Sequence, residues 1–234
     1  MTQNRSTAVM QRRVEAHDSL DDYPTPPWAT RAMLENVVMP LYAHTPEIAR
    51  MRMKKMHVQE PAANRGYMAR PLAEYFAEVY ASDVHDYGAG YPVSDYLMFG
   101  GGIAAQWTIT NPPFRLATEF IEHSFRNPLW GGTAVIVRSA FLEGGDRYDR
   151  LFSKRPPQII AQHCERVIMT KGIVRDPAKE YWDEVAQKMR RPSTATAYCW
   201  LIWTDLMPNN HTTQFRWIPP CRKAFEREGD YPCC

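Results

Sequence analysis

The sequence lacks an apolar run long enough to cross a bilayer as a helix, which takes about 18 residues or more. Its beginning also lacks the apolar core of a secretory signal, because Arg5, Arg12 and Arg13 stand there among acidic residues. We therefore expect a soluble cytoplasmic protein with no membrane partner.

Cysteine is scarce, and its placement argues against a disulfide framework. The chain has an odd number of cysteines and no Cys-x-x-Cys pair: Cys164, Cys199, Cys221, Cys233 and Cys234. His211, Cys221 and the terminal pair could gather a zinc ion, but their spacing fits no common ligand pattern. Free thiols and no metal are the preferred interpretation.

A large excess of charge and the common hydrolase motifs are also missing. The 28 Lys and Arg residues oppose 26 Asp and Glu residues, so affinity for nucleic acid would have to come from a local patch. Gly-x-Ser-x-Gly, His-Glu-x-x-His and Gly-x-x-x-x-Gly-Lys do not occur, which leaves hydrolase and nucleotidase functions without support. The 234 residues suit a single α/β domain.

An apolar, β-branched run that ends in Asn-Pro-Pro is the most informative stretch. Residues 107–110 favour a strand, and Pro112 and Pro113 must end it because proline cannot donate a ladder hydrogen bond. The prolines also hold the Asn111 carboxamide in a rigid turn. The Asn111 side-chain oxygen and the Pro112 carbonyl could each accept one N–H of a planar amine, with Phe114 stacked on its ring. A plain turn is the alternative, since Asn and Pro are common turn formers.

A strand, a tight loop of small residues and a helix precede this run. We expect the strand at 56–60, the loop at 61–66 and the helix at 67–77, which is the opening of a nucleotide-binding α/β fold. The next expected strand, 79–84, carries Asp83 about 20 residues beyond the loop, where such folds accept ribose hydroxyls.

The remaining periodicities complete an α/β fold with a mainly parallel sheet, an antiparallel edge strand and helices on both faces. Further helices are expected at 28–39, 116–125 and 146–153, and further strands at 133–142, 159–160, 166–169 and, as the final one, 195–203. Residues 1–22 are expected to be a disordered or irregular arm, 23–220 a single domain with a connection at 40–55, and 221–234 a tail.

The segment 170–193 is polar and rich in basic residues. Its candidate nucleic-acid contacts are Lys171, Arg175, Lys188, Arg190 and Arg191. Tyr181, Trp182, Val185 and Met189 recur at helical spacing within it, and exposed aromatic residues could help to open a duplex. A plain amphipathic surface helix is nearly as well supported, because four acidic residues share the segment.

Taken together, the motifs resemble those of S-adenosylmethionine-dependent amino-methyltransferases, whose catalytic motif is Asn/Asp/Ser-Pro-Pro-Tyr/Phe. The stretch 23–28, Tyr-Pro-Thr-Pro-Pro-Trp, resembles the family's N-terminal cofactor motif, and 94–97, Ser-Asp-Tyr-Leu, resembles the segment whose acid meets the cofactor's adenine. In the loop at 60–66 the family usually has Cys or a small residue where Ala63 stands, and glycine where Asn64 stands. Asparagine tolerates the left-handed conformation better than other residues with a Cβ, so the loop can still form.

The resemblance implies a Rossmann-like class I methyltransferase fold and assigns residues to two groups. The catalytic group is Asn111, Pro112, Pro113 and Phe114. The group that binds S-adenosyl-L-methionine is Tyr23, Thr25, Pro26, Trp28, Glu60, Pro61, Ala62, Gly66, Met68, Asp83, Val84, Asp95, Tyr96 and Asn111.

The implied activity is that of a site-specific DNA methyltransferase that methylates the N6 amine of adenine by base flipping and direct transfer. Such enzymes are carried by phages and prophages, alone or with a restriction partner, which implies a bacterial or phage-infected host cell, a DNA substrate and no obligate protein partner. Cytosine N4, RNA and protein glutamine remain alternative acceptors. An alternative of another class is a non-catalytic DNA-binding or scaffold protein that keeps the fold. It would have lost cofactor binding through Ala63 and Asn64, which depart from the family's loop.

Overall fold

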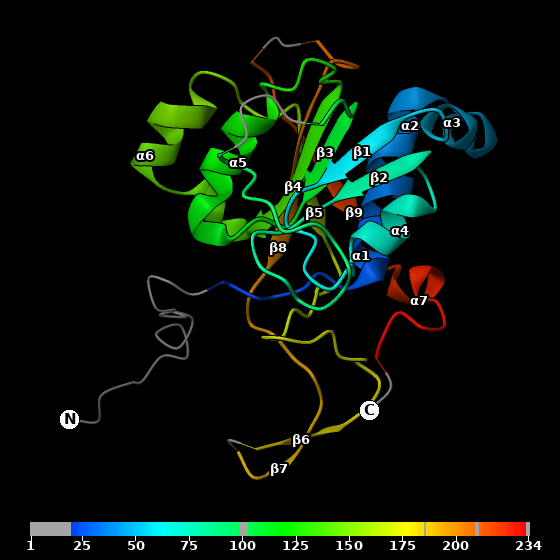
Figure 1. Ribbon diagram of the computed structural model, residues 1–234, viewed down its shortest axis with the longest axis vertical. Helices are drawn as coiled ribbons and strands as arrows, with labels where there is room; N and C mark the ends of the chain where they lie inside the picture. Colours follow the sequence, from blue (N-terminus) through cyan, green and yellow to red (C-terminus); the bar gives the residue numbers. More distant parts are fainter. Residues whose placement is uncertain (1–19, 99–102, 185, 209–210, 233–234) are drawn as a thin grey trace.

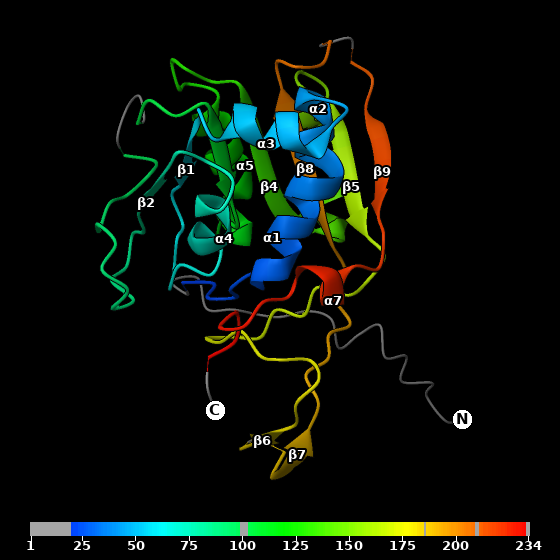
Figure 2. The same ribbon diagram turned by 90° about the vertical axis from the view of Figure 1, so that its right-hand side faces the viewer.

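A seven-stranded sheet with helices on both faces forms the body of the protein (Figures 1 and 2). The computed structural model describes residues 20–98, 103–184, 186–208 and 211–232. The strands, in the order in which they lie side by side, are β2 (Glu78–Ala81), β1 (His57–Glu60), β3 (Trp107–Thr110), β4 (Gly132–Arg138), β8 (Tyr198–Thr204), β5 (Ile159–His163) and β9 (Gln214–Ile218). All of them run parallel except β8, which is antiparallel to both of its neighbours.

Two helical layers bury opposite faces of this sheet. One face is covered by α1 (Pro27–Met33), the π-helical turn η2 (Leu34–Val38), α2 (Met39–Tyr42), α3 (Pro46–Met53) and α4 (Ala69–Ala73). The other is covered by α5 (Ala117–Ser124), η4 (Ser139–Leu142), α6 (Gly145–Arg147) and η5 (Tyr148–Phe152), while the turn η3 (Phe114–Leu116) before α5 places Phe114 against the first core. Successive residues of β4 alternate between the two cores, with Ile136 facing the first and Val137 the second.

The central strand β3 is buried along its whole length and is positioned by two contacts of Trp107. Its indole Nε1 donates a hydrogen bond of 2.6 Å to the Tyr42 hydroxyl. Its ring lies over Gly132 of β4, where an added Cβ would come within 2.5 Å of the ring. Only glycine therefore allows β4 to pair with β3 in this register.

Most expected elements are present, although two expected strands end earlier than predicted: β4 at Arg138 and β2 at Ala81. The helix expected at 28–39 is α1 with η2 and runs on into α2, and the strand expected at 107–110 has those bounds. The strand expected at 133–142 ends at Arg138, where the chain turns into η4. The helix expected at 67–77 is reduced to α4, although Met68, Leu72 and Phe76 are buried as predicted.

The expected antiparallel edge strand was placed wrongly. The antiparallel strand β8 lies inside the sheet, and β2 and β9 form its edges. Every residue of β8 is buried, which suits a strand covered on both faces and flanked on both sides. The prediction stopped at β8 because β9 exposes Phe215 and Trp217 and so has no apolar run.

Two other predictions were wrong, and the helical alternative for 170–193 is not what its described residues form. Residues 166–169 form no strand, although Val167 and Met169 are buried in the first core. The connection expected at 40–55 contains α3, which begins with Pro46 at its first position, a favourable place for proline. The described part of 170–193 contains no helix; it forms a hairpin of β6 (Tyr181–Asp183) and β7 (Lys188–Arg190).

The described part of the segment expected as a C-terminal tail is packed against the first helix. It contains α7 (Arg222–Phe225), and Asp230 accepts hydrogen bonds of 2.7 and 3.0 Å from the Arg31 guanidinium. Glu74 binds the other side of the same guanidinium. Both Arg31 and Asp230 are buried, so each requires the other's charge. Cys233 and Cys234, like residues 1–19 of the expected arm, lie outside the described residues.

We expect Asp230→Ala to lower the free energy of unfolding by about 3 kcal/mol, because the buried guanidinium would keep only Glu74 as a charged partner. Urea unfolding followed by circular dichroism would measure the change. The matched control is Glu228→Ala, which removes a nearby exposed carboxylate and should change the free energy by less than about 0.5 kcal/mol. Equal effects of the two substitutions would contradict the assignment.

Candidate functional site

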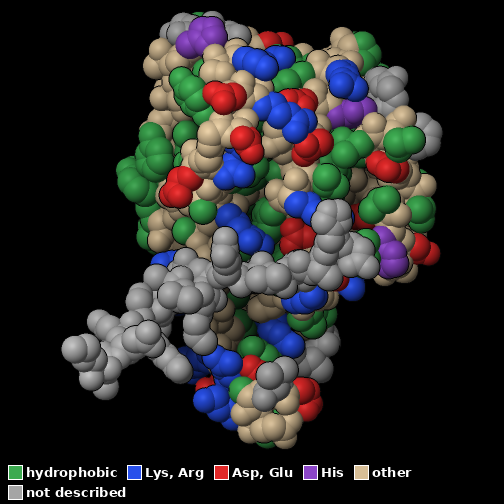
Figure 3. Space-filling view, turned by 90° about the vertical axis from the view of Figure 1, so that its left-hand side faces the viewer, with side chains coloured by type: hydrophobic (Ala, Val, Ile, Leu, Met, Phe, Trp, Pro, Cys, Tyr) green, Lys and Arg blue, Asp and Glu red, His purple; other side chains and the backbone are tan. Residues whose placement is uncertain are grey.

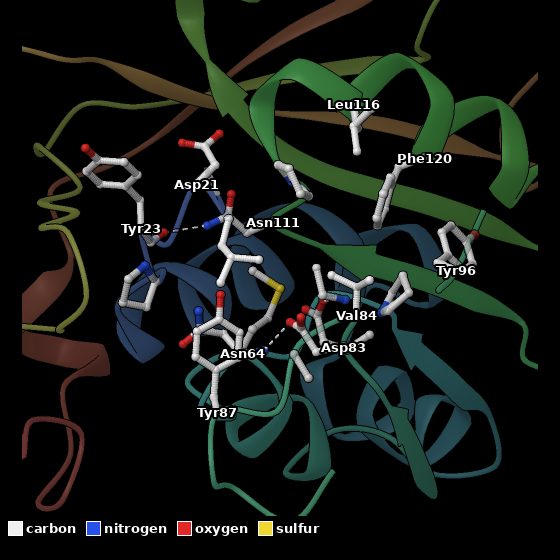
Figure 4. A pocket seen from close by; sticks show the side chains of 18 of the residues that line it. Asp21, Tyr23, Asn64, Asp83, Val84, Tyr87, Tyr96, Asn111, Leu116 and Phe120 are labelled. Carbon is white, nitrogen blue, oxygen red and sulfur yellow. Dashed lines mark hydrogen bonds between the residues drawn. The ribbon is translucent and has the colours of Figure 1, made fainter. Parts of the chain in front are cut away.

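A cavity of about 310 Å³ lies at the carboxyl ends of β1, β2 and β3 (Figure 4). Its walls come from the N-terminal segment, the loops that follow the three strands, and the start of α5. In open α/β sheets, ligands bind at this edge. The predicted residues that line the cavity are Tyr23, Thr25, Glu60, Pro61, Ala62, Met68, Asp83, Val84, Asp95, Tyr96, Asn111 and Pro113.

Asn111 is held at the mouth of this site by its amide nitrogen. Nδ2 donates a hydrogen bond of 2.8 Å to the Tyr23 carbonyl and lies 3.9 Å from the Met169 sulfur. No donor among the described residues is hydrogen-bonded to Asn111 Oδ1. The carboxamide is thus oriented by its donor group, and its acceptor group remains available for an external N–H.

The rest of the Asn-Pro-Pro-Phe turn is positioned by the residues around Phe114. The Phe114 N–H donates a hydrogen bond of 2.7 Å to Asp21 Oδ2. The Arg138 guanidinium lies 4.5 Å above the Phe114 ring, and the Tyr198 ring lies 6.0 Å from it. Phe114 and Pro112 are not among the residues that line the cavity, whereas Pro113 is.

Glu60 is the most perturbed acid of the site. It is fully buried at the end of β1, where Oε1 accepts hydrogen bonds from the Thr110 hydroxyl at 2.6 Å and the Ala62 N–H at 3.1 Å. Oε2 is buried and has no hydrogen-bond partner among the described residues. Burial raises the pKa of Glu60 from 4.5 to about 8, against the opposing effect of the two hydrogen bonds.

The loop that follows β1 takes the conformation expected of it. Asn64 has a φ of 52° and Gly66 a φ of 79°, so asparagine does occupy a left-handed position. Gly66 does not line the cavity; its φ is one that a residue with a Cβ rarely adopts, and an added Cβ would also come within 2.3 Å of the Tyr91 hydroxyl. The departure from glycine at 64 leaves the loop intact.

Two further acids stand around the cavity. Asp83 Oδ2 accepts the Asn64 N–H at 2.9 Å and Oδ1 accepts the His85 N–H at 3.0 Å, while burial raises the pKa of its carboxyl group. Asp95 is exposed and accepts the Leu97 N–H. Tyr96 beside it is buried, with its ring centroid 5.0 Å from that of Phe120.

The residues of the N-terminal cofactor motif, 23–28, lie partly in the cavity wall and partly in the hydrophobic core. Tyr23 and Thr25 line the cavity, and the Thr25 hydroxyl is buried without a partner among the described residues. Pro26 and Trp28 are not part of its lining. Trp28 is buried in the first core, with its ring centroid 5.5 Å from that of His163.

Several lining residues were not predicted as site residues. They are Leu20, Asp21, Pro24, Ala63, Asn64, Tyr67, Tyr87, Leu97, Arg115, Leu116 and Phe120. Leu116 and Phe120 were predicted only as apolar positions of a helix. Asp21 lies in the stretch expected to be disordered, where no periodicity marks it.

The basic candidates lie in and beside the hairpin, which projects from the strand-end side of the body (Figures 1 and 2). Positive side chains gather on this projection in Figure 3. Arg190 pairs with Asp183 at 3.0 Å and Arg191 with Glu180 at 3.6 Å, and the Arg175 guanidinium lies 3.8 Å above the Tyr181 ring. Lys188 is exposed on β7, and Lys171 lies just before the hairpin, in the loop 170–173. None of these five residues lines the cavity.

The described residues were also compared with the requirements of a metal site and of a membrane-spanning helix. No group of three or more His, Cys, Asp or Glu residues in the described ranges could hold a metal ion. No helix in those ranges is long and apolar enough to cross a membrane.

Comparison with known proteins finds similarity in structure only. No family model and no curated protein sequence matches the chain. A protein of Vibrio vulnificus YJ016, described provisionally as the modification subunit of a type I restriction enzyme, matches with a TM-score of 0.52 and 16% identity over 86% of this chain and 48% of that one. The chain thus spans about half the length of that protein.

Two other structures match equally well. One, from Listeria monocytogenes, is described provisionally as a class I S-adenosylmethionine-dependent methyltransferase; its TM-score is 0.52 and its identity 12%, over 85% of this chain and 67% of that one. The other, from Pyrococcus horikoshii, is described provisionally as an RNA methyltransferase; its TM-score is 0.53 and its identity 14%, over 88% of this chain and all of that one. The chain therefore has the Rossmann-like fold of these methyltransferases.

Glu60 predicts a specific pH dependence of the ligand-free protein. Because the pKa of Glu60 is raised from 4.5 to about 8 on folding, the folded state binds more protons between these values. The free energy of unfolding should therefore fall as pH rises from about 5 to 8, by a few kcal/mol in order of magnitude. Glu60→Gln should remove most of this slope in chemical unfolding at several pH values. An unchanged slope would show that Glu60 is not the group responsible.

Proposed function

We propose that this protein transfers a methyl group from S-adenosyl-L-methionine to the N6 amine of adenine in DNA. The observation that carries the proposal is Asn111, whose donor group is bound and whose acceptor group is available, beside a cavity that also holds Glu60 and Asp83. The fold, shared with methyltransferases, agrees with this activity.

The residues around the cavity suit this cofactor. Glu60 Oε2 is a buried acceptor without a partner in the described chain, and a cationic ammonium group of the cofactor would supply one. Asp83, at the end of β2, would accept the ribose hydroxyls. Tyr96, Leu97 and Phe120 line the cavity and offer apolar surface to the adenine.

Asn111 and its turn would prepare the acceptor amine. Asn111 Oδ1 and the Pro112 carbonyl each accept one N–H, which withdraws the nitrogen lone pair from the base and directs it outward. Phe114 lies beside the turn, with the Arg138 guanidinium 4.5 Å over its ring and the Tyr198 ring 6.0 Å away, so stacking of the base on Phe114 would require Arg138 to move aside. S-adenosyl-L-methionine would supply an electrophilic methyl group, which leaves its sulfur as the amine nitrogen forms the new bond and gives up a proton to water.

The hairpin would contact the nucleic acid. Trp182 and Met189 face each other across its two strands, 48% and 53% exposed. Exposed aromatic residues among cations are typical of surfaces that stack on bases and hold phosphates. Lys171, Arg175, Lys188, Arg190 and Arg191 would supply the phosphate contacts.

Other acceptors would use the same turn. Cytosine N4, RNA and protein glutamine are distinguished by which substrate accepts a labelled methyl group. RNA stays among these alternatives because the similar Pyrococcus structure is described provisionally as an RNA methyltransferase. A non-catalytic DNA-binding or scaffold protein would fail to bind S-adenosylmethionine. The left-handed Asn64 and the open cavity argue against that alternative.

Asn111→Ala should reduce methyl transfer at least about 100-fold, because the amine loses an acceptor that acts in the transition state. Expression in a host without adenine methylation, followed by mass spectrometry of N6-methyladenine and N4-methylcytosine, would measure this. Calorimetry with S-adenosylmethionine is the control: Asn111 also belongs to the implied cofactor group, but its loss should lower cofactor affinity far less than it lowers methyl transfer. Methyladenine from both proteins would contradict the role of Asn111, and none from the wild type would contradict the choice of DNA adenine.

Trp182→Ala and Lys188→Ala should each weaken DNA binding several-fold, with different salt dependence. Loss of a phosphate contact lowers the slope of log affinity against log salt by about one, whereas loss of a stacking residue leaves the slope unchanged. Fluorescence anisotropy with a short duplex would measure both effects. Trp217→Ala is the matched control, since Trp217 is also an exposed tryptophan but belongs to β9 of the large sheet and not to the hairpin. If it weakens binding as much as Trp182→Ala, the hairpin is not the contact.

A further inference from the structure

Asp22 lies where three separate segments meet beside the cavity. Its Oδ1 accepts a hydrogen bond of 2.7 Å from Asn64 Nδ2, in the loop after β1. Its carboxylate also pairs with the Arg65 guanidinium at 3.0 Å. Its backbone carbonyl accepts the Gly172 N–H at 2.9 Å, in the segment that leads into the hairpin.

The Asn64 side chain joins this contact to the cavity. Asn64 Oδ1 accepts hydrogen bonds from its neighbour's N–H at 2.7 Å and from Arg65 Nη1 at 3.0 Å, so both ends of the carboxamide are used. Its backbone N–H donates to Asp83, the acid at the end of β2. Asn64 and Tyr87 both line the cavity, and the Arg65 guanidinium lies 4.8 Å above the Tyr87 ring.

The geometry favours a specific interaction over simple packing. The Asp22 side chain is 16% exposed, so its charge is partly removed from water and is balanced by Arg65. Asn64 holds a left-handed backbone conformation, which is unfavourable for a residue with a Cβ unless local hydrogen bonds support it. The contact with Asp22 is one of those bonds. The N-terminal segment in turn lines the cavity through Leu20, Asp21, Tyr23, Pro24 and Thr25.

We infer that the Asp22–Asn64 pair is a positioning contact for the cofactor: it holds the N-terminal segment against the loop after β1 and thereby sets the affinity of the cavity for S-adenosylmethionine. The inference rests on the proposed cofactor. Neither residue needs to touch the reacting atoms. Asp22 influences the cavity in two ways. Its side chain holds Asn64, and its backbone continues into Tyr23, whose carbonyl accepts the hydrogen bond of Asn111.

The two side chains can be exchanged, which gives a sharp test. In Asn64→Asp two carboxylates would meet where a hydrogen bond of 2.7 Å now stands, and the affinity for S-adenosylmethionine should fall about tenfold or more. In the double variant Asp22→Asn with Asn64→Asp, the amide would donate from the other side, and the dissociation constant should return to within about threefold of the wild-type value. Asp is also tolerated in the left-handed region, so the backbone conformation is kept.

Titration calorimetry with S-adenosylmethionine would compare the wild type, Asp22→Asn, Asn64→Asp, the double variant and Asp146→Asn. The last removes an exposed carboxylate from α6 and should bind like the wild type. Melting temperatures of the same proteins separate loss of affinity from loss of fold: a positioning role requires that Asn64→Asp lose affinity at temperatures well below its melting temperature, where the protein is folded.

Three outcomes would count against the inference, and they can be told apart. If Asn64→Asp binds S-adenosylmethionine as the wild type does, or the double variant binds no better than Asn64→Asp, the positioning role is wrong while the proposed cofactor stands. If the wild type itself does not bind S-adenosylmethionine, the proposed function fails and this inference fails with it.

Discussion

The hydrogen bond between the Thr110 hydroxyl and Glu60 depends on the parallel pairing of β1 with β3, and the site is built around it. Parallel pairing brings two carboxyl ends to one edge, so that the buried acid of β1 and the Asn-Pro-Pro turn of β3 become neighbours. On its other side β3 is fixed against β4, because the Trp107 ring packs over Gly132 while its Nε1 is hydrogen-bonded to Tyr42. A change in this register would separate the acid from the carboxamide without altering either residue.

The sequence was most informative where one residue type has few alternatives. Pro112 and Pro113 marked the end of β3. The number of residues between the small-residue loop and Asp83 placed that acid at the end of β2, where it lines the cavity. Long apolar runs gave β4 and β8. The order of the strands in the sheet was harder to predict. The apolar run of β8 indicates a strand buried inside the sheet, but it does not identify the strands on either side.

The contacts that the sequence could not predict join distant segments through short polar side chains. Asp21, Asp22 and Asn64 belong to stretches without apolar periodicity, so nothing in the local sequence distinguishes them from solvated surface. The helical spacing of Tyr181, Trp182 and Met189 was misleading for a related reason. A short segment that packs on no core has no face to bury, and cross-strand pairing in the hairpin decided its structure instead.

The buried pair of Arg31 and Asp230 also has a consequence for how the protein is made. These residues are 199 positions apart, so during synthesis on the ribosome the first helix emerges long before its second carboxylate partner exists. Until then its guanidinium has only Glu74 to balance it, and full burial of α1 is unfavourable. The nascent chain therefore completes the packing of α1 only after Asp230 has been translated, which makes the segment around Asp230 part of the folding of a helix that lies 199 positions before it.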